Sequence, residues 1–379
     1  MSGLPLVDDA LAAVPPVPDG FRTRLEGQAY GLGFDLVGIT ELGTPDSVEH
    51  FDAWLAAGYH GEMDYMERGA ELRRDSRRPH PGATHVIVVG MHYGGGTPSG
   101  PVARYARGDD YHEIMRARLR ELHVWLIREL GVEIDARPYV DSGPLLERDL
   151  ARRAGLGWFG KNTILINPRQ GSWFFIGALV VDIALPIDAP FDADRCGTCT
   201  RCLDACPTDA FVAPHVLDAT KCISYLTIEL RGEIPESLRA MVGEHLYGCD
   251  VCQEVCPWNV KFTQELPDGS AFAARAMFVD KDARTLAREI LAMEPADYAA
   301  AFKGSAMKRA KLQGLKRNAA VVLGNVGTVD DLAELEAMRL HEHEVVREHA
   351  AWAILQIDAL NNTGSRMDGV GRSDRGERA

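Results

Sequence analysis

The sequence predicts an α+β protein built from several domains, and three observations lead to this fold class. Patterns typical of strands and of helices alternate over the first 190 residues. All eight cysteines gather between positions 196 and 256, and the chain after position 262 shows only helical patterns. The composition, 46% hydrophobic and 25% charged over 379 residues, is that of an ordinary globular protein with two or three domains. The net charge of −14 argues against a generally basic nucleic-acid binder, but not against local basic patches.

We expect residues 1–18 to be a disordered, proline-rich leader and residues 19–190 to form an α/β domain. The strands of this domain are predicted at DLVGIT, at the buried run HVIVVGMHY, at VEIDARPYV and, in a central position, at SWFFIGALVVDIAL. Helices are predicted at FRTRLEGQAYGLGF, SVEHFDAWLAAGY and PLLERDLARRAG, and over residues 111–130. The helix over 111–130 is the clearest of these. Its apolar residues recur at helical spacing (Met115, Leu119, Leu122, Leu126, Leu130), and Gly131 follows at the expected C-cap.

The next segment, 191–262, carries the cysteines. CGTCTRCLDACP places four of them at C-x₂-C-x₂-C-x₃-C-P, the spacing of bacterial ferredoxins, in which three ligate one cubane and the fourth ligates a second. Structural zinc, the main alternative, usually takes separated C-x₂-C pairs. Disulfides are disfavoured because no export signal precedes the chain, and the longest apolar run, WFFIGALVV, is too short to span a membrane. We therefore expect a cytoplasmic protein.

The remaining cysteines complete two ligand sets. GCDVCQEVCPWN supplies three, and KCISYLTIE supplies one. The crossed ferredoxin pattern assigns one [4Fe–4S] cluster to Cys196, Cys199, Cys202 and Cys256, and the other to Cys206, Cys222, Cys249 and Cys252. Two clusters in one ferredoxin-like module can pass electrons one at a time.

Two motifs resemble cofactor fingerprints incompletely. GLGWFGK at 155–161 matches G-x-G-x-x-G and the start of a Walker A loop, but Asn162 stands where Ser or Thr is needed. Because these glycines follow a predicted helix rather than a strand, a helix C-cap and turn is the favoured interpretation. DYHEIM at 110–115 begins like the Asp-x-His-x-x-Gly of some cobalamin proteins but ends in Met115. If a corrinoid binds, no motif supplies a histidine as its lower ligand.

The C-terminal part, 263–360, is expected to be helical, with a disordered tail at 361–379. R-x-x-A-x-x-L at 317–323 recurs loosely as R-x-x-A-x-x-A at 347–353, which suggests HEAT-like repeats. Within this part, residues 303–317 hold six basic residues and no acid. This segment is either a solvated helix face or a phosphate-binding stripe for tRNA made by Lys303, Lys308, Arg309, Lys311, Lys316 and Arg317.

Several stretches together resemble the epoxyqueuosine reductase family, the cobalamin-dependent iron–sulfur enzymes of queuosine synthesis in tRNA. The matching stretches, within about 60–325, are ELRRDSRRPHPGATHVIVVGMHY, ARYARGDDYH, YVDSGPLLERDLARRAGLGWFGKNTILINP, GSWFFIGALVVD, CGTCTRCLDACPTDA, CISYLTIE, GCDVCQEVCPWN and GSAMKRAKLQGLKRNAAVVLGN. The resemblance implies a corrinoid-binding α/β domain, a double-cubane module and a helical-repeat domain. It also implies reduction of the epoxide of epoxyqueuosine to queuosine by cob(I)alamin, which the clusters feed with electrons.

The resemblance implies site residues as well. Asp141 would be the proton donor to the epoxide oxygen and would need a raised pKa, although an N-cap of the following helix is an alternative role. The further candidates for cofactor contacts are Asp64, Arg104, Tyr105, Asp110, Tyr111, Lys161, Asn162, Ser224, Tyr225 and Asp250. For Arg104, Tyr105, Asp110 and Tyr111 the alternative is a solvated loop, and for Lys161 and Asn162 it is a surface turn. Thr227 and Glu229 lie near a cluster ligand in sequence, and Glu62 is carried by the resemblance alone.

The implied partners are the anticodon stem-loop of tRNAs with a GUN anticodon and a low-potential electron donor. We expect a monomer with no membrane contact. Two other functions remain open: a non-enzymatic ferredoxin-type electron carrier, which would leave the first 190 residues and the basic segment without a role, and a reductive dehalogenase-like corrinoid enzyme. Members of the latter class are typically exported with a twin-arginine leader, and none is visible in the sequence.

Overall fold

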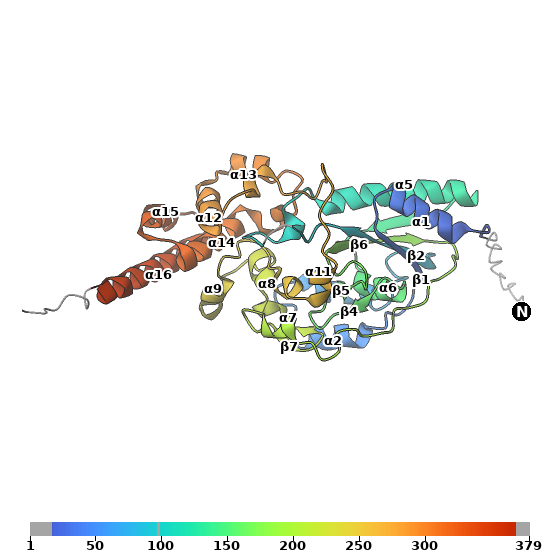
Figure 1. The fold of residues 1–379 in the computed structure, drawn as a ribbon, viewed down its shortest axis with the longest axis horizontal. Coiled ribbons are helices and arrows are strands. Elements are labelled where there is room, and N and C mark those ends of the chain that lie inside the picture. Colours follow the sequence, from blue (N-terminus) through green and yellow to red (C-terminus); the bar gives the residue numbers. More distant parts are fainter. Residues whose placement is uncertain (1–16, 97–98, 369–379) are drawn as a thin grey trace, which may run out of the picture.

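The computed structural model describes residues 17–96 and 99–368 (Figure 1). Most of the expected leader therefore lies outside the described residues. The expected tail is partly wrong, because helix α16 (Glu344–Asp368) continues through position 368, and the remainder of the tail also lies outside the described residues. No helix in the described ranges has both the length and the apolar character needed to cross a bilayer.

A four-stranded sheet forms the centre of the N-terminal half, in the order β1-β2-β6-β3. Its strands are β1 (Leu36–Glu41), β2 (His85–His92), β3 (Ala136–Tyr139) and β6 (Phe174–Val181). The predictions of a buried strand at β2 and of a central strand at β6 are confirmed. All three pairings are antiparallel, so the expected α/β class is wrong for this domain, which is α+β. The apolar periodicity of a strand does not reveal its direction, because direction depends on how the connections between strands run in space.

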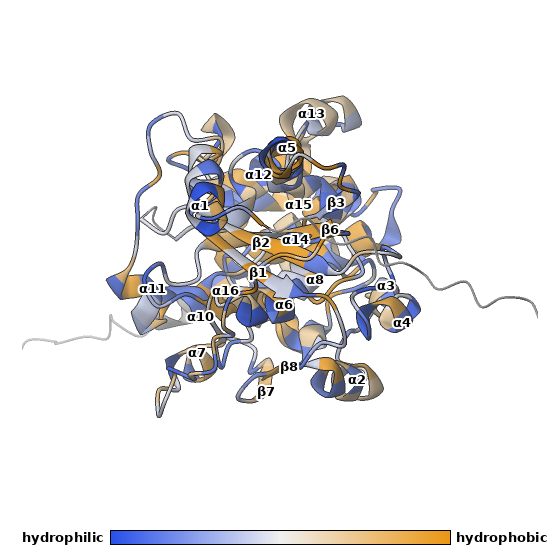
Figure 2. Cartoon of the chain, turned by 90° about the vertical axis from the view of Figure 1, so that its right-hand side faces the viewer, coloured by the Kyte–Doolittle hydropathy of each residue, from blue (hydrophilic) through white to orange (hydrophobic). Residues whose placement is uncertain are grey.

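Helices cover both faces of this sheet. α1 (Phe21–Gly31) and α5 (Tyr111–Leu130) pack on the face that carries Ile87 and Val89, and α6 (Glu147–Arg153) packs on the face that carries Val86 and Val88. The alternation along β2 follows from the period of two in a strand. α5 has its predicted bounds, its apolar row is fully buried up to Leu126, and Gly131 ends it in the left-handed conformation with φ of 67°. Figure 2 shows β2 and β6 as the hydrophobic centre between these helices.

Short elements connect the sheet to the rest of the chain. They are α2 (Val48–Ala56), α3 (Asp64–Arg68), α4 (Ala70–Arg73), the 3₁₀ turn η1 (Arg104–Ala106) and the small hairpin of β4 (Trp158–Phe159) and β5 (Leu165–Ile166). Gly155 follows α6 with φ of 78°, so the C-cap interpretation of GLGWFGK is confirmed.

The cysteine-rich module consists of short helices and loops. Its elements are α7 (Arg201–Asp204), β7 (Phe211–Ala213), β8 (Val216–Leu217), η2 (Ala219–Lys221), α8 (Ile223–Ile228), α9 (Glu236–Val242), α10 (Val251–Glu254) and α11 (Pro257–Lys261).

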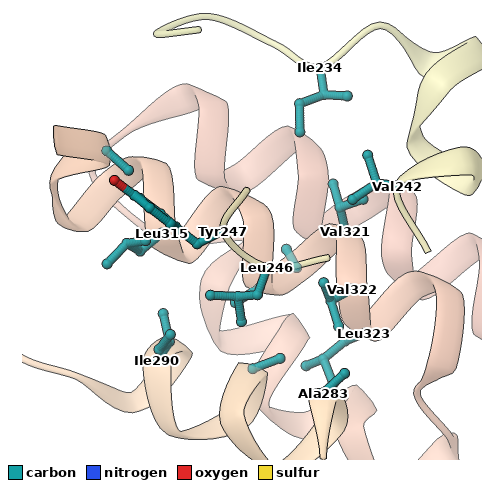
Figure 3. Packing of buried hydrophobic residues seen from close by; sticks show 14 of the residues in the cluster. Ile234, Val242, Leu246, Tyr247, Ala283, Ile290, Leu315, Val321, Val322 and Leu323 are labelled. Atoms are coloured by element: carbon teal, nitrogen blue, oxygen red, sulfur yellow. The ribbon is translucent and has the colours of Figure 1, made fainter. Parts of the chain in front are cut away.

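The C-terminal part is helical, as expected. It comprises η3 (Ala276–Phe278), α12 (Ala283–Ala292), α13 (Pro295–Ala301), η4 (Ala306–Ala310), α14 (Lys311–Val326), η5 (Val329–Asp331), α15 (Leu332–Met338) and α16. α14 lies between α12 and α16 and is the centre of this part. Its core is continuous with the cysteine-rich module, since Ile234, Leu246 and Tyr247 pack with Leu315 and Val322 (Figure 3). The boundary expected after residue 262 therefore does not separate two cores.

Candidate active site

The fold brings the eight cysteines together in two neighbouring groups. The thiol of Cys202 interacts electrostatically with those of Cys196, Cys199 and Cys256. The thiol of Cys249 does so with Cys206 and Cys222, and Cys252 does so with Cys222 and Cys249. Cys252 also interacts with Cys202, so the two sets lie next to each other.

Local backbone geometry supports thiolates at these positions. Cys222 and Cys256 are the N-caps of α8 and α11, so the backbone N–H groups of the first helical turn lie near their thiols and favour the ionised form. The backbone N–H of Ala210 donates to Cys206 Sγ at 3.3 Å. Amide hydrogen bonds to sulfur of this kind stabilise cluster ligands and tune their potentials.

The thiols are costly to ionise without a cation. Burial, reinforced by the neighbouring cysteines, raises the pKa of Cys202 to about 11 and that of Cys249 to about 12. A coordinated metal offsets this cost, because a coordinating thiol is deprotonated outright. Among the described residues, no three or more His, Cys, Asp or Glu side chains are arranged to hold a single metal ion. The first set instead lines a cavity of about 340 Å³ together with Lys161, Asn162 and Trp258.

Lys161 and Asn162 connect the sheet domain to the cysteine loops. Lys161 Nζ donates to the carbonyl oxygens of Gly197 and Cys199 at 2.6 and 3.0 Å, and Asn162 Nδ2 donates to Cys252 O at 3.2 Å. The alternative of a surface turn is wrong for Asn162, which is buried. Both residues contact backbone of the cysteine loops, one beside each set.

Arg104 and Asp250 form a buried pair between η1 and the second cysteine run. Asp250 Oδ2 accepts from the backbone N–H of Arg104 at 2.8 Å and from Arg104 Nη1 at 3.2 Å, and the same guanidinium donates to Glu254 at 2.6 Å. It also stacks over Trp173, 4.6 Å from the ring centroid. Burial raises the pKa of Asp250 even though Arg104 opposes the shift. The solvated-loop alternative is wrong for Arg104, which is 7% exposed.

The candidates of α8 also contact the loops around them. Ser224 Oγ accepts from the backbone N–H of the ligand candidate Cys249 at 3.1 Å, and Thr227 Oγ1 accepts from Gly248 N at 2.9 Å. The Tyr225 hydroxyl accepts from Glu62 N at 2.7 Å, which fixes the loop before α3. Asp64 is the exposed first residue of α3.

Asp141 lies in the loop between β3 and α6, in the left-handed conformation with φ of 56°. The backbone strain at a non-glycine residue is of the kind found at functional sites. Tyr111 donates its hydroxyl to Asp141 Oδ2 at 2.7 Å, and His112 Nε2 lies 3.6 Å from the same oxygen. The N-cap alternative is wrong, because α6 begins at Glu147 and Leu146 is its N-cap.

The charge state of Asp141 also differs from the prediction. Partial desolvation by the surrounding protein favours a raised pKa, but the interactions with His112 and Tyr111 outweigh it and hold the pKa of Asp141 below its usual value. The expected upward shift is therefore wrong for this conformation. Because the Asp141 side chain is 69% exposed, its desolvation is incomplete.

His112 was not among the sequence candidates, although DYHEIM contains it. Asp110 is the N-cap of α5 and accepts from His112 N at 3.0 Å, and its Oδ1 lies 2.7 Å from His112 Nδ1. Burial alone would lower the pKa of His112, but Asp110 and Asp141 together raise it to about 9. The contact between His112 and Asp141 becomes visible only when α5 and the Asp141 loop are seen together in space.

Tyrosines surround Asp141. Tyr111 stacks flat on Phe175 at 4.1 Å and meets Tyr105 edge-on at 6.2 Å. Tyr65 and Tyr105 both interact electrostatically with Asp141. Glu147 also interacts electrostatically with Asp141. Burial is the main cause that raises the pKa of Glu147 to about 8, and the charge of Asp141 adds to it.

The basic segment 303–317 splits into three kinds of residue. Lys316 and Arg317 are 5% and 1% exposed, so the prediction that they contact phosphates is wrong. Arg317 instead donates to the carbonyl oxygens of Leu226, Leu230 and Gly232. Arg309 is exposed but pairs with Glu229 at 2.6 Å. The exposed lysines of the segment are Lys303, Lys308 and Lys311.

Two family models match parts of the chain. One, described as "Epoxyqueuosine reductase QueG, DUF1730", matches residues 73–142, and the other, a "4Fe-4S double cluster binding domain", matches residues 195–259. The first contains Arg104, Tyr111, His112 and Asp141, and the second contains all eight cysteines. The second match identifies the cysteine loops as a module for two 4Fe-4S clusters.

Curated relatives and solved structures match nearly the whole chain. An epoxyqueuosine reductase of Xanthomonas campestris pv. campestris is 43% identical over 353 residues, which cover 90% of this chain and 97% of the relative. That of Escherichia coli K12 is 43% identical over 338 residues, 86% of each chain. The crystal structure of an epoxyqueuosine reductase with an epoxyqueuosine-modified tRNA-Tyr stem loop is similar with a TM-score of 0.79 and 30% identity, covering 93% of this chain and 95% of that one. The Bacillus subtilis enzyme, with its catalytic aspartate loop swung out of the active site, gives a TM-score of 0.77 at 29% identity and the same coverage.

Proposed function

Because the chain belongs to the epoxyqueuosine reductase family, we propose that it reduces the epoxide of epoxyqueuosine in tRNA to the alkene of queuosine. The reaction consumes two electrons and two protons and releases the epoxide oxygen as water. The observation that carries the proposal is the pairing of Asp141 with His112 and Tyr111, because Tyr111 also interacts with Tyr247 of the cysteine-rich module. This arrangement would place a proton donor near the proposed clusters.

The two cysteine sets are proposed as the ligands of the two clusters. Their adjacency, through Cys202 and Cys252, supports transfer of single electrons from one cluster to the other. Ser224, Asn162, Lys161 and Asp250 would hold the ligand loops in place, since each hydrogen-bonds their backbone or lies between two ligands.

A corrinoid is proposed as the final electron carrier, and when bound it would supply a strongly reducing, nucleophilic cobalt centre. A corrin is a flat apolar ring with amide groups at its edge, so its site needs flat side chains beside hydrogen-bonding groups. The donor set around Asp141 fits this need. It combines Tyr65, Tyr105 and Tyr111 with Glu147, whose buried Oε1 has no hydrogen-bond partner among the described residues. Asp64 lies next to Tyr65 on α3 and is proposed with them.

We propose that the C-terminal helices are a HEAT-like domain that binds the tRNA stem-loop. The side-by-side packing of α12, α14 and α16 supports this assignment. Lys303, Lys308 and Lys311 are the proposed phosphate contacts, because they are the exposed lysines of the basic segment. tRNAs with a GUN anticodon and a low-potential electron donor remain the proposed partners.

The test is Asp141→Asn in the holoenzyme with both clusters and the corrinoid in place. Asn cannot give up a proton, and loss of a general acid typically lowers the rate about 10²–10⁴-fold. We expect this loss in single-turnover reduction of an epoxyqueuosine-containing stem loop, with unchanged iron content and stem-loop affinity. Asp135→Asn is the matched control, because the side chain of Asp135 is 71% exposed and Asp135 precedes β3, at the opposite end of this strand from Asp141. A near-normal rate for Asp141→Asn would remove Asp141 from the proposed role.

A further inference from the structure

The first turn of α5 and the Asp141 loop bring three ionisable side chains into one row. Asp110 Oδ1 lies 2.7 Å from His112 Nδ1, and His112 Nε2 lies 3.6 Å from Asp141 Oδ2. An ionised carboxylate can only accept hydrogen bonds, so Nδ1 carries a hydrogen that it donates to Asp110. A second proton on the ring is therefore on Nε2 and faces Asp141.

We propose that His112 supplies the proton that Asp141 delivers to the leaving epoxide oxygen, with Asp110 holding the imidazole in the required orientation. The inference rests on the proposed function, because it needs Asp141 to be the group that meets the substrate. His112 acts through Asp141, so it is a positioning residue that stores a proton. The side chain of His112 is 24% exposed, which leaves a route for its reprotonation from water.

The inference accounts for the low pKa of Asp141. A general acid must carry its proton at the working pH, yet Asp141 in this conformation is an ionised carboxylate near neutral pH. The pKa of His112, about 9, means that the missing proton is on the imidazole. Near pH 7 the pair therefore holds one transferable proton and rests as imidazolium and carboxylate.

Substrate binding would move this proton. Asp141 is exposed in this structure, and a substrate placed over it would remove water from the ion pair. Desolvation penalises both charges, whereas imidazole and carboxylic acid are both neutral. Transfer from His112 Nε2 to Asp141 Oδ2 then produces the acid only when the substrate is in place.

Other charged and titratable groups also act on the pair. Tyr111 donates to the same oxygen of Asp141, and Glu147 and Arg148 from α6 interact with Asp141 electrostatically. Arg116 faces Asp110, and Tyr65 and Tyr105 face Asp141. The pKa of Glu147 is about 8, because burial and the charge of Asp141 raise it, so Glu147 adds a negative charge mainly above that pH.

The proton balance of the step is closed. One proton leaves His112 Nε2 and forms the O–H bond of Asp141, which then passes it to the oxygen released by C–O cleavage. The imidazole becomes neutral and keeps its Nδ1–H bond to Asp110. The clusters, when bound, would supply the two electrons, and water would supply the second proton of the reaction.

The decisive variant is His112→Gln, studied in holoenzyme that is reduced first and then mixed with the modified stem loop across pH 6–10. We expect the single-turnover rate to fall about 10- to 100-fold, within the range for loss of a proton-transfer group. The wild-type rate should fall above about pH 9, where His112 loses its proton, and this alkaline limb should disappear in the variant. Asp110→Asn should move the limb to lower pH. His123→Gln, on the same helix, is the control and should keep both rate and limb.

A readout independent of turnover separates the possible failures. In NMR of histidine-labelled, oxidised holoenzyme, the His112 signal is identified by its loss in His112→Gln. Its pKa should fall when Asp141 is changed to Asn. If His112→Gln keeps a normal rate and alkaline limb while Asp141→Asn is slow, the inference about His112 is wrong and the proposed function stands. If Asp141→Asn itself turns over normally, the proposed proton donor is wrong. A purely structural role for His112 would lower stability in His112→Gln and leave the alkaline limb in place.

Discussion

The cysteine loops at 195–259 and the basic segment at 303–317 pack against each other, but their polar groups face different partners. The cysteines of each set face one another. The basic residues have three kinds of surroundings. Arg317 is buried against carbonyl oxygens of α8 and of the residues just after it, and Arg309 pairs with Glu229. Lys308 and Lys311 are exposed. The ligands of a cluster must converge on one point, whereas a basic side chain can serve as a buried donor, an ion-pair partner or a phosphate contact. Sequence spacing therefore specifies the first region much more tightly than the second.

The largest expected effect concerns Cys222, the only proposed ligand that lies outside the two cysteine runs. Cys222→Ala should remove one cluster and leave the other, so iron should fall from about eight per chain to about four. Iron analysis and electron paramagnetic resonance after anaerobic reconstitution would measure this change. Cys222→Ser is a useful companion, because it keeps the size of the side chain. Eight irons in Cys222→Ala would mean that the crossed assignment of ligands is wrong.

The second effect tests the buried side of the basic segment. Arg317 is 1% exposed and donates to three backbone carbonyls near the cysteine loops. Arg317→Met would leave these acceptors without their donor, and each buried acceptor left unpaired costs about 1–3 kcal/mol. Lys308→Met, at an exposed position of the same segment, should change the free energy of unfolding by less than about 0.5 kcal/mol. Denaturant unfolding of the two variants compares them directly. Equal stabilities would contradict the structural role of Arg317.

The same contrast explains which features could be predicted from the sequence. The cysteine sets, the helix over 111–130 and the strands at β2 and β6 follow from local spacing, because ligand geometry and apolar periodicity act within short segments. The antiparallel sheet could not be predicted in this way, because strand direction depends on how β1, β2 and β6 meet in space.

The active-site chemistry was predictable only in part. Asp141 was a candidate from the sequence, but its partner His112 comes from α5, nearly 30 residues away in the chain. The direction of the shift in its pKa depends on that partner, so no local pattern could give it. In the basic segment, burial of Lys316 and Arg317 depends on the packing of α14 against α8, α12 and α16.

The third prediction concerns His349, which joins α16 to the cysteine-rich module. His349 is fully buried, its Nδ1–H donates to Val345 O at 2.7 Å, and its Nε2 accepts from Ile234 N at 3.1 Å. Burial, with the nearby charge of Arg239, lowers the pKa of His349 to about 4. The His349 ring is therefore neutral in the folded chain, and only this neutral form can both donate through Nδ1–H and accept at Nε2.

Acid should weaken the junction. Between about pH 6.5, the ordinary value for histidine, and pH 4, the unfolded chain binds a proton at His349 and the folded chain does not. This contribution to stability is present in full above pH 6.5 and is lost as the pH falls through that window, about 3 kcal/mol in total. The raised pKa of His112 acts in a different window, from about 6.5 to 9. Unfolding at several pH values should show a smaller acid dependence in His349→Gln than in the wild type. The same dependence in both would contradict the assignment.

The smallest expected effect tests the exposed side of the basic segment. If Lys308 and Lys311 each neutralise a phosphate of the tRNA stem-loop, the double change to Gln should make the slope of log K against log salt shallower by about 1.8. Affinity for a tRNA-Tyr stem loop should fall about 10- to 100-fold at about 0.1 M salt, because each contact releases about 0.9 of a counterion.

The matched control is the double change of Arg120 and Arg128 to Gln. These are exposed basic residues of α5 outside the basic segment, so this control removes the same charge and isolates position from net charge. If the two double variants have the same salt slope, the lysines act only through the overall field of the protein, and the tRNA must contact another surface. If the Lys308 and Lys311 variant alone has a shallower slope and keeps its clusters, the two lysines bind the nucleic acid. Arg317 of the same segment then has a separate role, which is to stabilise the fold.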